Sequence, residues 1–180
     1  MVKATAKAKA AAREGMLPNP ESRIPNPESR PMSFHICQAT IHHLDKLAPL
    51  FDEYRQFYGQ PGDLSRAREF LAERFRHHES LILLALDPQR EGVGFVQLYP
   101  LFSSVRTVRT YVLNDVFVLL RVRRQGVAAA LLTAAADHAR ALGAASLSLS
   151  TARDNASAQA LYASLGWQRD QQFCDYNLTL

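Results

Sequence analysis

A short basic segment, residues 123–128, has the residue types and spacing of an anion-binding loop. Its two arginines supply positive charge, while Gly126 and Ala128 keep bulky side chains away from the backbone. The alanine-rich stretch 126–142 contains no proline and is followed by Gly143, which predicts a helix. A helix N-terminus exposes unpaired N–H groups and carries about half a positive charge, so it attracts anions. The segment therefore predicts a pyrophosphate site, although an ordinary basic turn before a core helix has the same composition.

A second pattern follows after one more strand-like stretch. Residues 145–151 alternate apolar and hydroxyl side chains, which predicts a strand. Residues 155–167 begin with Asn155, whose side chain can cap a helix, and reach Gly166, which can end it. Tyr162 flanks the apolar stripe of this predicted helix, so we expect it to lie beside a crevice next to the core.

Together the two segments resemble the signatures of the GNAT superfamily of N-acetyltransferases. The first has the Arg-x-x-Gly-x-Ala spacing of the family's acyl-CoA loop. The second matches Asn-x-x-Ala-x-x-Leu-Tyr-x-x-x-Gly-Phe, with Trp167 in place of the usual Phe. The resemblance covers about residues 108–180. It implies an enzyme that uses acetyl-CoA as a co-substrate and acetylates an amine.

The resemblance also implies which residues bind acetyl-CoA. The backbone groups of Phe117 and Val118 would pair with the pantetheine arm as a neighbouring strand does, and Arg123 and Arg124 would contact the phosphates. The complete expected set is Phe117, Val118, Arg123, Arg124, Gln125, Gly126, Val127, Ala128, Asn155, Ala158 and Tyr162.

Acetyl transfer requires a neutral amine. A lysine-like amine with a pKa of about 10.4 is neutral only about once in 2,500 molecules at pH 7, so a base or a proton-accepting water chain is expected. Family members often carry a Glu on the strand before the CoA loop. If that Glu aligns with Asn114, the direct base is missing, because an amide cannot accept the proton, and Asn114 would instead orient a water or the substrate.

Asp115 is the nearest carboxylate, but a regular strand would turn it to the opposite face. A β-bulge would re-aim it. A catalytic base and a structural hydrogen bond are equally supported for Asp115 at this stage.

Tyr162 corresponds to the tyrosine that protonates the departing thiolate in the family. Proton transfer from a phenol with a pKa of about 10 to a thiolate of about 8.5 is uphill by roughly 2 kcal/mol, so hydrogen bonding is its main expected contribution. The catalytic candidates are therefore Tyr162, Asp115 and Asn114.

The rest of the chain predicts the elements that position these residues. Apolar residues at three- and four-residue spacing indicate helices from Thr40 to about Tyr58 and from Asp63 or Ser65 onward. Strands are expected at 34–39, 80–86, 92–101, 108–118, 145–151 and about 173–180. Adjacent strands mixed with helices predict an α+β fold, and the GNAT arrangement implies a central mixed, mostly antiparallel sheet flanked by helices.

Residues 1–31 differ in character from residues 32–180, which form the predicted N-acetyltransferase domain. A proline-rich six-residue motif at 18–23 recurs at 25–30, a period of seven residues, and its prolines forbid helix, so we predict a disordered segment. The repeat is more typical of spurious coding sequence than of a targeting helix. We predict that Met32 is the functional start, which the intact mass of protein made from the native gene would test.

Charge and composition exclude several classes of function. Six of the 21 basic and three of the 17 acidic residues lie in 1–31, which leaves 15 and 14 in the body and argues against a nucleic-acid surface. No apolar run approaches the ~20 residues of a membrane span. Cys37 and Cys174 are expected to be thiols, which favours the cytoplasm. The six histidines show no metal-binding spacing, so no metal is expected.

The leading functional hypothesis is acetylation of a small primary amine, such as a polyamine or diamine. Acceptor contacts are expected from Asp52, Glu53, Tyr54, Tyr58 and Asp63. Two alternatives stay open: acetylation of a protein lysine or N-terminal amine, and a non-catalytic acyl-CoA-binding regulatory module. A homodimer is also an expected assembly, since the family often dimerises.

Overall fold

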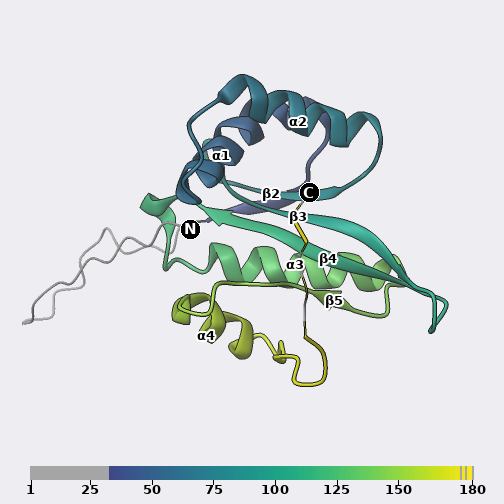
Figure 1. The fold of residues 1–180 in the computed structure, drawn as a ribbon. Coiled ribbons are helices and arrows are strands. Elements are labelled where there is room, and N and C mark those ends of the chain that lie inside the picture. Colours follow the sequence, from purple (N-terminus) through teal and green to yellow (C-terminus); the bar gives the residue numbers. More distant parts are fainter. Residues whose placement is uncertain (1–32, 175, 177, 180) are drawn as a thin grey trace, which may run out of the picture. The chain divides into compact units, whose positions relative to one another are not determined.

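The computed structural model describes residues 33–174, 176, 178 and 179, and these contain a five-stranded sheet in the order β1-β2-β3-β4-β5. The first four strands are antiparallel neighbours, and β5 joins β4 in parallel (Figure 1). The strands are β1 (His35–Gln38), β2 (Leu81–Leu86), β3 (Gly92–Ser103), β4 (Val108–Val118) and β5 (Leu147–Ser148). The predictions for residues 1–31 and for Met32 lie outside the described residues.

Helices cover both faces of this sheet. In Figure 1, α1 and α2 lie on one side, and α3 and α4 lie on the other. The helical elements are η1 (Ile41–His43), α1 (Leu44–Phe57), α2 (Leu64–Arg76), η2 (Leu120–Val122), α3 (Val127–Ala141) and α4 (Ala156–Ser164), where η marks a short 3-10 turn. The predicted α+β fold, with a mixed and mostly antiparallel sheet, is confirmed.

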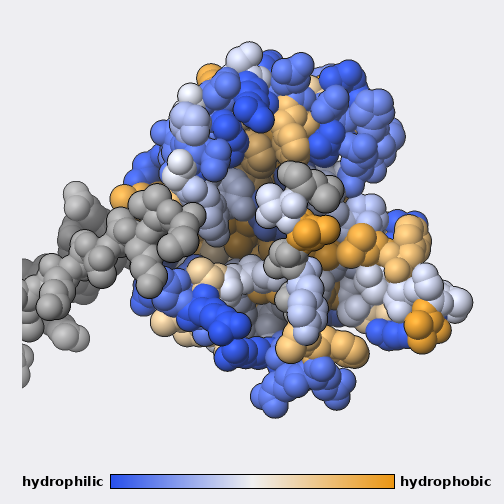
Figure 2. Space-filling view, viewed as in Figure 1, coloured by the Kyte–Doolittle hydropathy of each residue, from blue (hydrophilic) through white to orange (hydrophobic). Residues whose placement is uncertain are grey.

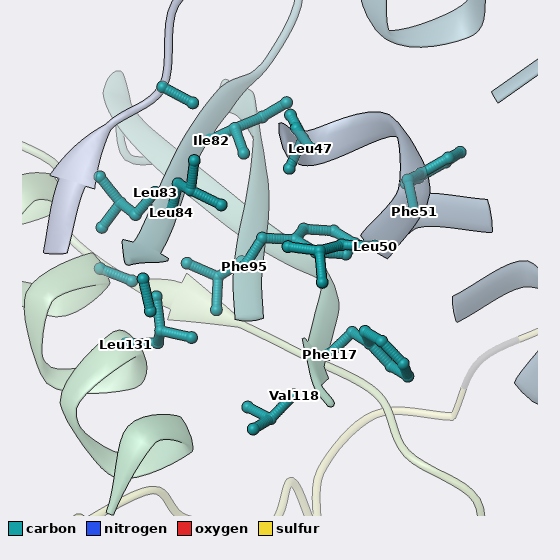
Figure 3. Packing of buried hydrophobic residues seen from close by; sticks show 14 of the residues in the cluster. Leu47, Leu50, Phe51, Ile82, Leu83, Leu84, Phe95, Phe117, Val118 and Leu131 are labelled. Atoms are coloured by element: carbon teal, nitrogen blue, oxygen red, sulfur yellow. The ribbon is translucent and has the colours of Figure 1, made fainter. Parts of the chain in front are cut away.

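Helices bury both faces of the sheet, which is why β2 consists of apolar residues alone. Phe95 of β3 contacts Phe51 of α1, with ring centroids 6.0 Å apart, while Leu131 of α3 packs on the opposite face of the sheet (Figure 3). Full burial of such a side chain contributes roughly 1.5–3 kcal/mol. The outer surfaces of α1 and α2 are hydrophilic, as their amphipathic sequences require (Figure 2).

The starts of α1 and α2 are set by the residues that immediately precede them. The segment after Thr40 first forms the 3-10 turn η1, and the α-helix begins only at Leu44. Asp63 is the N-cap of α2, because its side chain accepts a hydrogen bond from the Arg66 amide at 2.9 Å. Of the two predicted starts for this helix, Asp63 is therefore the cap.

The C-terminal strands are shorter than predicted. The strand expected at 145–151 is reduced to Leu147–Ser148, which pair only with Tyr111 and Val112 of β4. The strand expected at about 173–180 is absent from the described residues of that segment. A two-residue strand offers few backbone partners to a further strand, and the later part of β4 has no partner in β5.

Candidate active site

A β-bulge in β4 determines which side chains reach the site. Gln97 of β3 pairs with Asp115, but the next pair joins Leu98 to Leu113, so Asn114 is an extra residue without a partner in β3. An inserted residue shifts the alternation of side chains by one and turns Asp115 to the other face. The bulge proposed from the sequence is therefore confirmed.

A cavity of about 600 Å³ opens beside the bulged part of β4. Its walls come from the C-terminal turn of α1, the end of β4, the start of α3, and α4. This volume lies within the usual range for small-molecule sites, about 300–1,000 Å³. The cavity brings together Asn114, Phe117, Val118, Arg123, Arg124, Gly126, Val127, Ala128, Asn155, Ala158 and Tyr162, all of which the sequence had singled out.

The start of α3 forms one end of the cavity. Gly126 is the N-cap with a φ of 85°, a left-handed conformation that favours glycine. A Cβ atom built on Gly126 would meet nothing within 4 Å, so the backbone faces open space. An uncovered helix N-terminus beside cationic side chains, the arrangement expected from the sequence, is present here.

The three polar side chains before Gly126 lie in different surroundings. Arg123 donates from Nε to the carbonyl oxygen of Val118 at 2.9 Å, and its guanidinium lies 5.4 Å from the ring centre of Phe57. Arg124 is exposed and lines the cavity. Gln125 does not line the cavity, and its amide nitrogen lies 3.5 Å from the carbonyl oxygen of Arg121. Arg123 is thus fixed in the wall, while Arg124 stays available to an anion.

The start of α4 forms another wall. The side-chain oxygen of Asn155 accepts a hydrogen bond from the Ala158 amide at 3.2 Å, which confirms the predicted cap. The Asn155 amide nitrogen also lies 3.3 Å from the hydroxyl of Thr151. These contacts hold the first turn of α4 against the cavity, and so they place Ala158 and Tyr162 in its lining.

Tyr162 is buried and belongs to the lining of the cavity. Burial raises the pKa of its phenol, and the neighbouring Tyr58 raises it further. The phenol therefore stays neutral at physiological pH and remains a hydrogen-bond donor. A raised pKa also makes it a weaker acid, which favours hydrogen bonding over complete proton transfer.

Asp115 is buried and lies outside the cavity lining. Burial raises the pKa of its carboxyl, and hydrogen bonds with Tyr54 and Asn114 lower it in part. The Asn114 amide nitrogen donates to Asp115 Oδ1 at 3.1 Å. Asn114 and Tyr54 both line the cavity, so Asp115 is linked to the cavity through these two side chains.

The buried carboxyl predicts a pH-dependent stability. Because the folded pKa of Asp115 is raised above its ordinary value of 3.8, the folded protein binds more protons than the unfolded chain in the window above that value. The Asp115 contribution to the free energy of unfolding is present below this window and is lost as pH rises through it. We expect the free energy of unfolding of Asp115→Asn, relative to that of the wild type, to increase from acid to neutral pH. Urea unfolding of both proteins at several pH values would measure this, and a difference between them that stays constant with pH would contradict it.

Two of the three carboxylates predicted to contact the acceptor, Asp52 and Asp63, have structural partners. Asp52 accepts hydrogen bonds from Arg55 at 3.0 Å, from Gln56 at 2.9 Å and from the Asp63 amide at 2.8 Å. These bonds hold the connection between α1 and α2. Asp52, Glu53 and Asp63 do not line the cavity, whereas the aromatic candidates Tyr54 and Tyr58 do.

Two residues of this region were missed by sequence reasoning. Phe57 lines the cavity although it lies outside the apolar stripe used to predict α1. Gln97 is fully buried beside the bulge, and its amide nitrogen donates to the Ser80 hydroxyl at 2.7 Å. A glutamine within an apolar strand was the only available signal. Within the described residues, no group of three metal-ligating side chains occurs, and no helix is long and apolar enough to cross a membrane.

Fold and cavity together define the class of protein. Residues 47–167 match the Acetyltransferase (GNAT) family, and the chain belongs to this family. It is 44% identical over 146 residues to the Uncharacterized N-acetyltransferase YhfO of Bacillus subtilis (strain 168), a match that covers 81% of this chain and 97% of that protein. The resemblance to an N-acetyltransferase found in the sequence is thus confirmed.

Solved structures agree with this assignment. A structure described as a probable acetyltransferase is 46% identical, with a TM-score of 0.78, and the match covers 81% of this chain and 97% of that chain. Aminoglycoside N-acetyltransferase AAC(6')-Iy in complex with CoA is 20% identical, with a TM-score of 0.67, and the match covers 84% of this chain and 99% of that chain. At that identity the second likeness shows the fold alone.

Proposed function

We propose that this protein transfers an acetyl group directly from acetyl-CoA to a primary amine. The observation that carries the proposal is one cavity that joins the open start of α3 to Asn114 and Tyr162. Such a cavity gives a phosphate-binding end for the donor and places polar side chains further along the same space.

The donor end suits the chemistry of CoA. Backbone N–H groups at the start of α3, the charge of Arg124 and the space around Gly126 would hold the pyrophosphate. Beyond Val112, β4 has no partner in β5, so the backbone of Phe117 and Val118 can pair with the pantetheine arm. A protein of the same fold, 20% identical to this chain, was solved with CoA, which supports this choice of donor.

The reaction requires one bond to form and one to break. The amine nitrogen attacks the thioester carbonyl carbon, the new C–N bond replaces the C–S bond, and the leaving CoA thiolate takes up a proton. We assign hydrogen-bond donation to the thiolate to Tyr162, whose phenol is neutral and lines the cavity.

Asn114 would orient the amine or a water that removes its proton, because it is the polar β4 side chain in the lining. We propose that Asp115 is a positioning residue, since its carboxylate is buried outside the lining and holds the Asn114 amide at 3.1 Å. Direct proton acceptance by Asp115 is the alternative. Asp115→Asn would separate the two, because it preserves a partner for Asn114 and removes the basic oxygen.

The finer expectations from the sequence stay predictions. They comprise a polyamine or diamine acceptor, one acetyltransferase domain over residues 32–180, a cytoplasmic location and a homodimer. Acetylation of a protein lysine or N-terminal amine remains the alternative enzyme activity. A non-catalytic acyl-CoA-binding module remains the alternative of another class, motivated by an amide where the family often has a carboxylate.

Thiol release from acetyl-CoA in the presence of a panel of amines tests the proposal. We expect amine-dependent release well above the rate of thioester hydrolysis in water, with the acetylated amine detected by mass. Binding of acetyl-CoA in calorimetry without release for any amine would contradict the transferase and select the regulatory module.

A further inference from the structure

Three aromatic side chains at the C-terminal turn of α1 form one wall of the cavity, and we call Tyr54, Phe57 and Tyr58 the aromatic wall. Phe57 is 60% exposed and Tyr58 is 59% exposed. Their rings meet edge to face, with centroids 5.3 Å apart and planes at 87°. Exposed aromatic rings that border an apolar cavity are typical of surfaces that contact a flat or apolar ligand.

The cavity offers no anionic partner among the described residues that line it. Its only charged lining side chains are Arg123 and Arg124, and Arg123 already lies over the ring of Phe57 at 5.4 Å. The neighbouring Asp52 is bound by Arg55 and Gln56. A positively charged acceptor would therefore find no carboxylate in the lining to pair with, which favours an acceptor that enters as a neutral amine.

Amine classes differ strongly in how often they are neutral. At pH 7 an alkyl amine with a pKa of about 10.4 is neutral roughly once in 2,500 molecules, while a peptide-type α-amine with a pKa of about 7.7–8.0 is neutral roughly once in ten. The α-amine thus presents several hundred times more of its nucleophilic form. This difference matters most in a site where no carboxylate is part of the lining and Asp115 is buried behind it.

We infer that the acceptor is a peptide-type α-amine carried on an apolar or aromatic body, which packs against Phe57 and Tyr58. This inference rests on the proposed acetyl transfer and replaces the polyamine or diamine acceptor expected from the sequence. The α-amine would point toward Asn114, and the body would cover the aromatic wall, so that Arg124 at the donor end remains free for the phosphates.

Four amines separate the two features of this inference. L-phenylalaninamide has a low-pKa α-amine and an aromatic body, glycinamide has the amine alone, and 2-phenylethylamine has the aromatic body with an ordinary alkyl amine. Putrescine has neither feature and carries two charges. We expect kcat/KM at pH 7 to be highest for L-phenylalaninamide, lower for glycinamide and 2-phenylethylamine, and at least a hundredfold lower for putrescine. The value for 2-phenylethylamine should rise about tenfold per pH unit between pH 7 and 9, as its neutral fraction does.

Removal of one ring from the aromatic wall gives a second test. Tyr58→Leu should lower the ratio of kcat/KM for L-phenylalaninamide to that for glycinamide by roughly threefold to tenfold, as expected when one aromatic pair is lost. Phe102→Leu is the matched control, because Phe102 is 69% exposed and lies on β3 outside the cavity. This control should leave the ratio unchanged.

The outcomes distinguish the inference from the function on which it rests. Putrescine turned over as well as L-phenylalaninamide would overturn the inference and leave acetyl transfer intact. An unchanged ratio in a folded Tyr58→Leu protein would also overturn it. Failure of all four amines in a protein that binds acetyl-CoA would overturn the proposed transferase and the inference together.

Discussion

Tyr162→Phe is expected to lower kcat about a hundredfold while the Kd for acetyl-CoA changes little. The hydroxyl removed by this change would interact with sulfur mainly when negative charge develops on it, in the transition state. General acid assistance contributes roughly 10²–10⁴-fold, and the raised pKa of Tyr162 places the expected loss at the lower end. Steady-state kinetics and calorimetry on the same preparation would measure the two quantities.

Tyr111→Phe is the matched control for this prediction. Tyr111 is a buried tyrosine on β4, but it does not line the cavity, and its hydroxyl lies 3.4 Å from an Arg109 nitrogen. The control should retain kcat within about threefold. If Tyr162→Phe also lost less than about threefold, the ring would be acting through packing alone and water would protonate the thiolate.

Gly126→Val should weaken acetyl-CoA binding by more than tenfold. The new side chain would occupy the open space in front of the α3 N-terminus, where the pyrophosphate is proposed to lie. It would also strain the backbone, because the φ of 85° disfavours any residue with a Cβ, at a cost of about 1–2 kcal/mol. Affinity and stability must therefore be measured separately.

Gly143→Val separates the two effects. Gly143 follows the other end of α3, has a φ of 72°, and would also place its Cβ atom in open space. Both variants should lose similar free energy of unfolding, but only Gly126→Val should lose affinity in calorimetry. Equal affinity for both folded variants would exclude the helix start as the phosphate site.

Much of the fold could be predicted from the sequence because local patterns and tertiary structure agree. The bounds 108–118 of β4, Gly126 at the start of α3 and the Asn155 cap were read from strand composition, a helix start signal and a capping residue. Each of these depends on residues close together in the chain.

The short β5 and the position of Asp115 depend on strand pairing instead. The period-two pattern of 145–151 indicates a strand but does not reveal how many residues find partners, and β4 offers only two. Sequence reasoning raised the bulge at Asn114 without deciding whether Asp115 faces the cavity, because that depends on the register with β3. The carboxylate of Asp52 was assigned to the acceptor because its bonds to Arg55, Gln56 and the Asp63 amide depend on how the α1–α2 connection folds back on α1.

Because of the bulge, the face to which each side chain of β4 points depends more on the number of residues in the strand than on the identity of residue 114. The strand consists of two halves whose inward and outward positions are out of phase, and Asn114 joins them. Deletion of this single residue would restore one uninterrupted alternation and exchange the two faces of the second half. Asp115 and Phe117 would then move to the face of the sheet that Val116 and Val118 now occupy. Substitutions at position 114 leave this phase intact, whereas a one-residue gap there would rebuild the wall on which the donor is proposed to lie.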